Sequence, residues 1–296
     1  MSKVLSLTDA IHEYITPHCS VFIGAAHEAL IPFAAVYEII RQGTQHLTFC
    51  APISDIASDL LVGAGLVDCI YAAWSGNVSG GLGHNLRRAA EHGVPHAVEM
   101  VDYSNYAMAL ALQAAAMGVP FLPTRSLNGS DLIRSRAGFE PFMWHGQPLV
   151  AVPALQPDVV ILGVQKADAD GNAAIDGPVG MTHESLMAAR HVVVLCEELV
   201  AKGHLGQESW HLTVPGFLVD AVVAVPYAFH PSPCLGYYGR DTAFFQQYHR
   251  ESRDPQEFHQ WLQDWVYVDG HADYLRRLGK DRLTHVKSEE GVMSWP

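Results

Sequence analysis

Short apolar runs recur along the chain, and stretches with helical periodicity separate them. Buried strands of a parallel sheet have this appearance, because helices cover both faces of such a sheet. The sequence therefore predicts an α/β fold, a mostly parallel sheet with helices on its faces. The expected strands are Ser20 to Ile23, Leu47 to Cys50, Leu66 to Tyr71, Ala97 to Val101, Leu149 to Val152, Val159 to Val164, His191 to Cys196 and Ala221 to Val225.

The first strand, the loop that follows it and the next helix form a potential binding unit. Ser6 to Asp9 opens a helix whose apolar residues share one face, and Pro32 begins a second helix, Phe33 to Gln42. Between them, the first strand ends in a loop of mostly small residues, Gly24, Ala25, Ala26, His27 and Glu28. A strand, loop and helix in this order can bind phosphate or carboxylate groups, although most α/β proteins contain several such loops.

The stretch from Glu99 to Arg134 carries the densest local signals. Asp102, Ser104 and Asn105 are residues that cap helices, and Ala107 to Met117 are almost entirely strong helix formers, so a helix buried nearly all round is expected. Gly118 ends this helix, and a short extended segment, Val119 to Pro123, leads into the polar loop Asn128, Gly129, Ser130 and Asp131.

The last part of the chain differs in character. From Asp241 onward it is aromatic and polar, with Phe244, Trp261, Trp265 and Tyr267 at helical spacings. This pattern predicts a helical extension, residues 241–296, packed on one α/β domain, residues 1–240. The stretch from Gly138 to Pro148 is expected to be a loop.

Composition narrows the function classes. The chain has 296 residues, of which 49% are hydrophobic, and its net charge is -13, so it is a globular protein that would repel nucleic acid. Five scattered cysteines without a CxxC pair favour a reducing cytoplasm over a disulfide framework or a zinc cage. Neither an export signal nor an apolar run near ~18 residues is present, which argues against a membrane location.

Common catalytic motifs do not occur. The chain lacks GxSxG and GxGxxG; Ser79 stands in an unsuitable glycine spacing, and Gly63 to Gly65 are expected to end a helix. His84, His92 and His96 are expected on an exposed turn rather than at a metal, and no metal site is predicted.

Two polar positions have two interpretations each. Asp102 follows an apolar strand and precedes an apolar helix, so it is either a helix N-cap or a carboxylate at the active cleft. The loop Asn128 to Asp131 is either a second cap or a source of donors for a ligand oxygen. Because ligands of open α/β sheets bind outside the carboxyl ends of strands, we expect the loops 24–28 and 128–131 to meet at one cleft.

With these motifs in order, the chain resembles the α subunit of class I coenzyme A transferases, most closely the A subunit of glutaconate CoA-transferase. The matching segments are MSKVLSLTDAI at residues 1–11, PFAAVYEIIRQG at 32–43, VDYSN at 101–105, GVPFLPTRSLNGSDL at 118–132, CEELV at 196–200, VPGFLVDAVVAVPYAFHPSPCLGYY at 214–238 and FHQWLQDWVY at 258–267. The resemblance implies a three-layer α/β/α fold of the glucosamine-phosphate and ribose-phosphate isomerase group.

It also implies an activity and a partner. A heteromeric transferase of this kind moves CoA between carboxylic acids through a glutamyl thioester, and the glutamate belongs to a β subunit, in an α2β2 or larger assembly. Coenzyme A thioesters are then substrates, and no tightly bound cofactor is expected. This chain would contribute the cleft wall and substrate-binding residues, namely Gly24, Ala25, Ala26, His27, Glu28, Ser104, Asn128, Gly129 and Ser130.

Two departures from the family pattern bear on the substrate. Relatives commonly carry an Arg shortly before the Pro of the first loop, whereas Leu30 and Ile31 precede Pro32 here. A dicarboxylate's second charge ordinarily pairs with Arg, so glutaconate does not follow from the resemblance. Relatives often have two adjacent carboxylates where this chain has Asp102 alone. Alternatives are a CoA-thioester C–C hydrolase or decarboxylase with Asp102 as base, and a non-catalytic scaffold that binds acyl-CoA.

Overall fold

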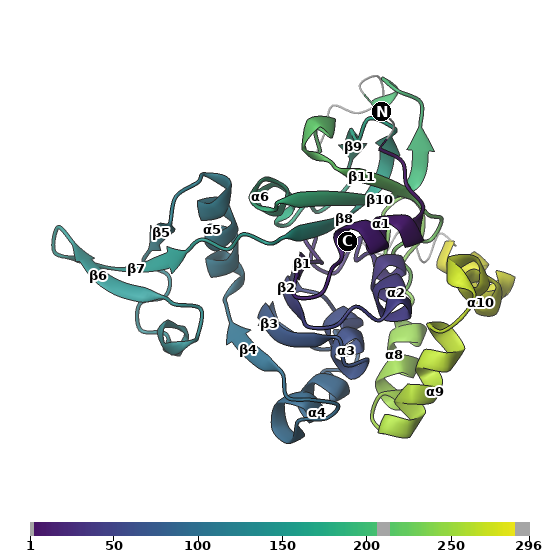
Figure 1. The fold of residues 1–296 in the computed structure, drawn as a ribbon, viewed down its shortest axis with the longest axis horizontal. Helices are drawn as coiled ribbons and strands as arrows, with labels where there is room; N and C mark the ends of the chain where they lie inside the picture. Colours follow the sequence, from purple (N-terminus) through teal and green to yellow (C-terminus); the bar gives the residue numbers. More distant parts are fainter. Residues whose placement is uncertain (1–2, 206–213, 288–296) are drawn as a thin grey trace.

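A large twisted sheet crosses the centre of the molecule (Figure 1). The computed structural model describes residues 3–205 and 214–287. The strand order is β11-β10-β8-β1-β2-β3-β4, every neighbouring pair on this path is parallel, and the short β9 adds antiparallel to β8. The strands are β1 (Ser20–Phe22), β2 (Leu47–Ile53), β3 (Val67–Trp74), β4 (Glu99–Asp102), β8 (Val159–Asp168), β9 (Ala173–Ala174), β10 (His191–Val200) and β11 (Ala221–Ala224). The mostly parallel sheet is confirmed.

Helices cover the sheet on both sides, as predicted. Helices α1, α2 and α3 pack beside one another, whereas α5 packs against α6 (Figure 1). Their bounds are α1 (Leu7–Tyr14), α2 (Phe33–Gln42), α3 (Ile56–Gly63), α4 (His84–His92), α5 (Asn105–Ala116) and α6 (Thr182–Ala188). Central strand residues such as Val21 and Phe22 are fully buried. His84 and His92 lie at the two ends of α4, so the expected exposed turn is wrong for these two residues.

A second, antiparallel sheet projects beside α5 (Figure 1). Its order is β5-β7-β6, from β5 (Phe121–Thr124), β6 (Glu140–Trp144) and β7 (Gln147–Pro153), and the 3₁₀ helix η1 (Asp131–Arg134) lies between β5 and β6. The run Leu149 to Val152, expected in the main sheet, belongs to β7, and the expected loop 138–148 contains β6 and the turn of a hairpin. Both errors have one cause: β6 is largely exposed, so it lacks the apolar signal of a buried strand.

Helix α5 is buried on one side rather than all round. Ala107, Met108, Ala111 and Leu112 are fully buried, whereas Met117, just after the helix, is 61% exposed. Alanine is found on both buried and exposed faces, so an Ala-rich helix lacks the contrast between apolar and polar faces. The sequence therefore gave no sign of which side of α5 is exposed.

The C-terminal helices pack on the α/β core through aromatic rings. They are α8 (Thr242–Glu251), α9 (Pro255–Trp265) and α10 (Gly270–Lys287), the last kinked at Gly279. Tyr274 of α10 lies 5.2 Å from Tyr37 of α2, measured between ring centroids. Trp261 is 1% exposed within this cluster, whereas Tyr267 remains 43% exposed. The division at residue 240 stays a prediction.

Within residues 3–205 and 214–287, no helix combines the length and the apolar character needed to cross a membrane.

Candidate functional site

The loops at the carboxyl edge of the main sheet contain non-glycine residues in a left-handed backbone conformation. His27 and Leu30 follow β1, Asp55 follows β2 and Tyr227 follows β11, and all four have positive φ, between 47° and 63°. Non-glycine residues rarely adopt this conformation, which costs on the order of 1–3 kcal/mol and persists where the surroundings enforce it. His18 and His46, which precede β1 and β2 at the opposite edge, also have positive φ, so strain alone does not select the site. Ligands of parallel sheets bind at the carboxyl edge, and this edge is therefore the candidate site.

The loop Gly24 to Glu28 is held by close backbone contacts. Gly24 has φ +84°, and a Cβ there would lie 2.3 Å from the Ile53 carbonyl oxygen. A Cβ on Gly180 would lie 2.1 Å from the Ala25 carbonyl oxygen, which accepts a 2.7 Å hydrogen bond from the Met181 N–H. Glycine is therefore required at both positions, and the loop is fixed against β2 and the start of α6.

His27 and Glu28 occupy different environments in this loop. His27 is half-buried, its Nδ1 has no hydrogen-bond partner within the described residues, and burial lowers its pKa below the ordinary histidine value despite the neighbouring Glu28. The Glu28 side chain is exposed, while its carbonyl oxygen accepts a hydrogen bond from the Ser232 hydroxyl. A neutral imidazole with a free ring nitrogen thus lies at the carboxyl edge.

Glu197 of β10 has a structural role at this edge. Its carboxylate accepts hydrogen bonds from the N–H groups of Tyr227 (2.7 Å) and Ala228 (2.8 Å) and from the Tyr238 hydroxyl. Burial raises the pKa of Glu197, and these hydrogen bonds oppose the rise. Glu197 therefore stabilises the strained turn after β11, and both of its carboxylate oxygens already accept hydrogen bonds from this chain.

Sequence reasoning missed the ion pair between Asp55 and Arg240. The Arg240 Nη2 lies 2.6 Å from Asp55 Oδ2, and the Asp55 side chain is fully buried. Burial raises the pKa of Asp55, and the Arg240 charge opposes this rise. The two residues are 185 positions apart in the chain, so no local pattern could have paired them.

Asp102 lies at the same edge of the sheet, at the end of β4. A hollow of about 590 Å³ is lined by Asp102, Ser130, Asp131, Leu132, Arg134 and Ser135. Ser104, not Asp102, caps α5, because the Ser104 hydroxyl accepts a 3.1 Å hydrogen bond from the Ala107 N–H. The N-cap interpretation of Asp102 is therefore wrong, and its exposed carboxylate faces this hollow.

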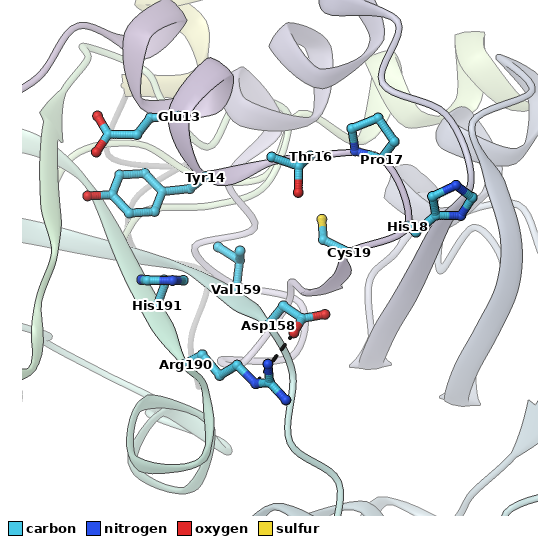
Figure 2. Close-up of a pocket in the computed structure, with 10 residues that line it drawn as sticks. All are labelled: Glu13, Tyr14, Thr16, Pro17, His18, Cys19, Asp158, Val159, Arg190 and His191. Atoms are coloured by element: carbon cyan, nitrogen blue, oxygen red, sulfur yellow. Dashed lines mark ion pairs between the residues drawn. The ribbon is translucent and has the colours of Figure 1, made fainter.

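A second hollow, of about 490 Å³, lies at the opposite edge, where β1, β8 and β10 begin (Figure 2). Cys19, Asp158 and His191 are among the residues that line it. Asp158 accepts hydrogen bonds from both the N–H (2.9 Å) and the hydroxyl (2.8 Å) of Ser20, so it ties the entry to β1 to the entry to β8. Its carboxylate has a structural partner, and ligands of parallel sheets bind at the other edge.

Comparison with known proteins agrees with this architecture. A family model described as coenzyme A transferase matches residues 4–225. The chain belongs to the coenzyme A transferase family. It is 35% identical over 277 residues to the A subunit of 3-oxoadipate CoA-transferase from Pseudomonas knackmussii, a match that covers 93% of this chain and 96% of the relative.

Glutaconate CoA-transferase is similar in both sequence and structure. Its A subunit from Acidaminococcus fermentans is 32% identical over 311 residues, which cover 99% of this chain and 97% of the relative. The crystal structure of glutaconate CoA-transferase from that organism matches with a TM-score of 0.91 at 31% identity, covering 98% of this chain and 97% of the other. The three-layer CoA-transferase fold with C-terminal helices is thus shown.

Within this coenzyme A transferase fold, the predicted substrate-binding residues fall into two groups. Ser104, Asn128, Gly129 and Ser130 lie with or near Asp102 beyond β4, whereas loop 24–28 follows β1. Strands β2 and β3 separate β1 from β4, a span of about 14 Å at ~4.8 Å per strand, and the hollow at Asp102 includes no residue of loop 24–28. That the two loops meet at one cleft stays a prediction.

The loop 128–131 uses its polar groups locally. The Asn128 side-chain amide donates a 2.8 Å hydrogen bond to the Pro148 carbonyl, and the Ser130 hydroxyl caps η1 by accepting from the Leu132 N–H at 3.2 Å. Gly129 has φ +79°. These contacts favour the cap interpretation of the loop, and ligand contacts by these residues stay a prediction.

No group of three or more His, Cys, Asp or Glu residues placed to hold a metal ion occurs in the described part of the chain.

Proposed function

We propose that this chain is the α subunit of a heteromeric CoA-transferase that moves coenzyme A between two carboxylic acids. The observation that carries the proposal is similarity over nearly the full length of two relatives, each named as the A subunit of a CoA-transferase. Coenzyme A enters as a thioester substrate. The acids of those relatives, 3-oxoadipate and glutaconate, are dicarboxylic acids, and we extend that class to this chain.

The glutamate that carries the acyl group belongs, in this proposal, to the partner β subunit. Support comes from the glutamates of this chain near the carboxyl edge. Glu197 is engaged by three donors, and Glu198 accepts a 2.9 Å hydrogen bond from the Tyr237 hydroxyl. Glu28 is exposed, but no glycine follows it to allow close backbone donors. Glu289 and Glu290 lie outside the described residues.

The reaction proceeds by successive acyl transfers. The partner's glutamate carboxylate attacks the thioester carbonyl carbon, and the CoA thiolate leaves to give a mixed anhydride. The thiolate then attacks the glutamyl carbonyl, releasing the first acid and forming the glutamyl-CoA thioester, and the second acid reverses these steps. Dividing the exchange in this way replaces one difficult displacement by several easier ones.

This chain contributes a wall of the active cleft and backbone donors from loop 24–26. Charge develops on the carbonyl oxygen in each tetrahedral intermediate, and donors already fixed in place stabilise it without reorganisation. The close contacts of Gly24 and Gly180 supply that rigidity. We further propose an α2β2 or larger assembly. We place it in the cytoplasm, a location that the five free cysteines support, because disulfides are rare in a reducing compartment.

Exchange assays on the chain alone and on the reconstituted complex test this proposal. The isolated chain should show no exchange of label between acetyl-CoA and a free acid, and no borohydride-sensitive thioester adduct. Adding the β subunit should produce both signals. Exchange by the rigorously isolated chain, abolished by changing one of its own glutamates, would contradict the assignment of the glutamate to the partner.

A further inference from the structure

Aromatic side chains gather on one face of the small antiparallel sheet, which is formed by β5, β7 and β6 and projects from the α/β body (Figure 1). Successive side chains of a strand point to opposite faces. Phe121, Phe142 and Trp144 share one face, because their pairing partners on β7 are an even number of positions apart. The ring centroids of Phe121 and Phe142 are 6.2 Å apart, in an edge-to-face arrangement, as residues on the same face can be.

This face is open to solvent, whereas the opposite face is partly covered. Phe121 is 43% exposed and Trp144 is 61% exposed, and no residue on their face is buried. On the opposite face, Thr124, Val150 and Val152 are buried by the chain itself. An exposed apolar patch of this kind marks an interaction surface. The face of Phe121, Phe142 and Trp144 is therefore an open face available to a partner.

The edge of the small sheet is less suited to a partner than its open face. Strand β6 is the outer strand, and Pro141 within it has no N–H group to donate to a further strand. Proline in an edge strand discourages pairing with another chain. A partner therefore packs side chains against the open face rather than extending the sheet.

Charge and area argue against a second copy of this chain as the occupant. The chain carries a net charge of -13, so two copies repel one another. Three strands of about five residues cover on the order of 250 Å² per face, given ~4.8 Å between strands and ~3.4 Å per residue. A stable interface buries about 800 Å² per partner. The open face is thus too small to hold a dimer by itself, and it fits an occupant that also binds elsewhere on this chain.

The β subunit of the proposed transferase meets that condition. Its glutamate has to reach the carboxyl edge of the main sheet, so the β subunit lies over that edge. The hollow at this edge is lined by Asp102 and by residues such as Ser130 and Ser135, which belong to the segment that connects β5 to β6. The small sheet is therefore continuous with a wall of the candidate site. One partner can cover both surfaces, and together they supply the area that the open face lacks.

We propose that the open face of the small sheet binds the β subunit, with Trp144 as its main apolar contact. The proposal rests on the proposed transferase function, because it takes the second chain of that enzyme as the occupant. The matching surface of the β subunit is apolar, so that the side chains of both chains leave water together. Tryptophan is enriched among the residues that dominate binding energy, because it buries a large apolar area.

The test compares two neighbouring residues of β6 that are almost equally exposed. Trp144 (61%) lies on the open face, and Met143 (63%) points to the opposite face. Biolayer interferometry gives the dissociation constant for the separately purified β subunit with the unmodified chain, with Trp144→Ala and with Met143→Ala. Trp144→Ala should weaken binding about thirtyfold or more, as loss of a hot-spot tryptophan does, and Met143→Ala should weaken it less than about threefold.

Further measurements separate docking from folding and from catalysis. The melting temperature should be unchanged in both variants, because both side chains are exposed. Phe121→Ala is a second probe of the open face if Trp144→Ala does not fold, and it should weaken binding about tenfold. At saturating β subunit, exchange by the Trp144→Ala complex should equal that of the unmodified complex, because the open face holds no reacting group.

Sedimentation of the chain alone tests the rival occupant. We expect the monomer of 32.3 kDa. A dimer that Trp144→Ala dissociates would assign the open face to a second copy and overturn the proposal.

The binding results separate this proposal from the proposed function. Equal binding by the unmodified chain and Trp144→Ala, or equal losses for Trp144→Ala and Met143→Ala, would overturn the role of the open face even if the complex exchanges CoA. A complex that Trp144→Ala weakens but that shows no exchange would contradict the transferase and leave the docking surface in place. No binding of the β subunit by the unmodified chain would overturn both.

Discussion

A buried charge network connects the C-terminal helices to the α/β core, and Asp241→Asn tests how much it stabilises the fold. Asp241 Oδ2 lies 3.0 Å from His230 Nε2 and 2.6 Å from Arg282 Nε, and Oδ1 accepts a 2.9 Å hydrogen bond from the Phe244 N–H. The His230 side chain is fully buried, and that of Asp241 is 5% exposed. The substitution removes the charge and keeps the shape.

The expected loss follows from these contacts. Asn caps helices about as well as Asp, so the contribution of the Phe244 N–H is retained. Removing one partner of a buried ion pair costs about 3–5 kcal/mol, because the other charge is left uncompensated. Arg282 is 26% exposed and water partly solvates it, so we expect a loss of about 2–3 kcal/mol in the free energy of unfolding at pH 7.

The loss should depend on pH in one direction. Burial by itself raises the pKa of Asp241, but His230 and Arg282 outweigh burial and hold that pKa well below its ordinary value. The stabilising contribution is therefore complete above the unfolded-state pKa of about 3.9 and is lost as the pH falls below it. The difference between the two proteins should be constant from pH 7 to about 5 and shrink in more acidic solution.

Urea unfolding followed by tryptophan fluorescence measures this difference. Asp254→Asn is a matched control, because Asp254 caps α9 through the N–H groups of Gln256 and Glu257 but is exposed and has no ion pair with any described residue. It should change stability by less than about 0.5 kcal/mol. Equal losses for the two variants, or a loss below about 1 kcal/mol for Asp241→Asn, would refute the argument from burial.

Three further predictions concern single residues. Asp102→Asn should leave the melting temperature unchanged, because Ser104 is the cap, and a changed turnover of the assembled enzyme would show that this carboxylate acts in the reaction, as the hydrolase or decarboxylase alternative requires. Gly129→Val should destabilise the chain by at least about 1–2 kcal/mol in urea unfolding, because φ is +79° there and a β-branched residue is strained; unchanged stability would remove that requirement. Burial lowers the pKa of His271 to about 4. The Nε2 atom of His271 lies 2.7 Å from the Pro226 carbonyl oxygen, within hydrogen-bond distance. The unfolded chain therefore takes up the proton first, at its ordinary pKa of about 6.5, so stability should fall as the pH drops from about 6.5 towards 4. His271→Gln, which does not titrate, should reduce that dependence when unfolding midpoints are compared at pH 7 and 5, and the remainder comes from other histidines whose pKa burial lowers, such as His27 and His230.

Sequence patterns located the parallel sheet because its strands are buried on both faces. The runs around Val21, Val160 and Val193 are continuous and apolar, and each forms a strand of the main sheet. Glycine and proline also marked helix ends correctly, as at Pro32, the N-cap of α2, and at Gly63, the last residue of α3. The family resemblance rested on such segments, and it is confirmed.

The caps of α5 show where the sequence was ambiguous. Asp102, Ser104 and Asn105 are all capping residue types within four positions, and only the backbone shows that Ser104 has the extended conformation and the bond to Ala107. The antiparallel sheet was missed for a related reason. Exposed strands such as β6 gain their stability from pairing, and pairing partners leave no periodic apolar signal in one strand.

The parallel strands of the main sheet, the family and the two polar loops could be read from the chain alone, because they depend on local burial and backbone preference. The tertiary structure decided which of those elements form the site. Asp55 and Arg240, like Glu197 with Tyr227 and Ala228, meet only when strands are placed side by side and the C-terminal segment returns across their ends. Electrostatic partners act over a few ångströms in space, whatever their separation along the chain, so these contacts have no sequence signature.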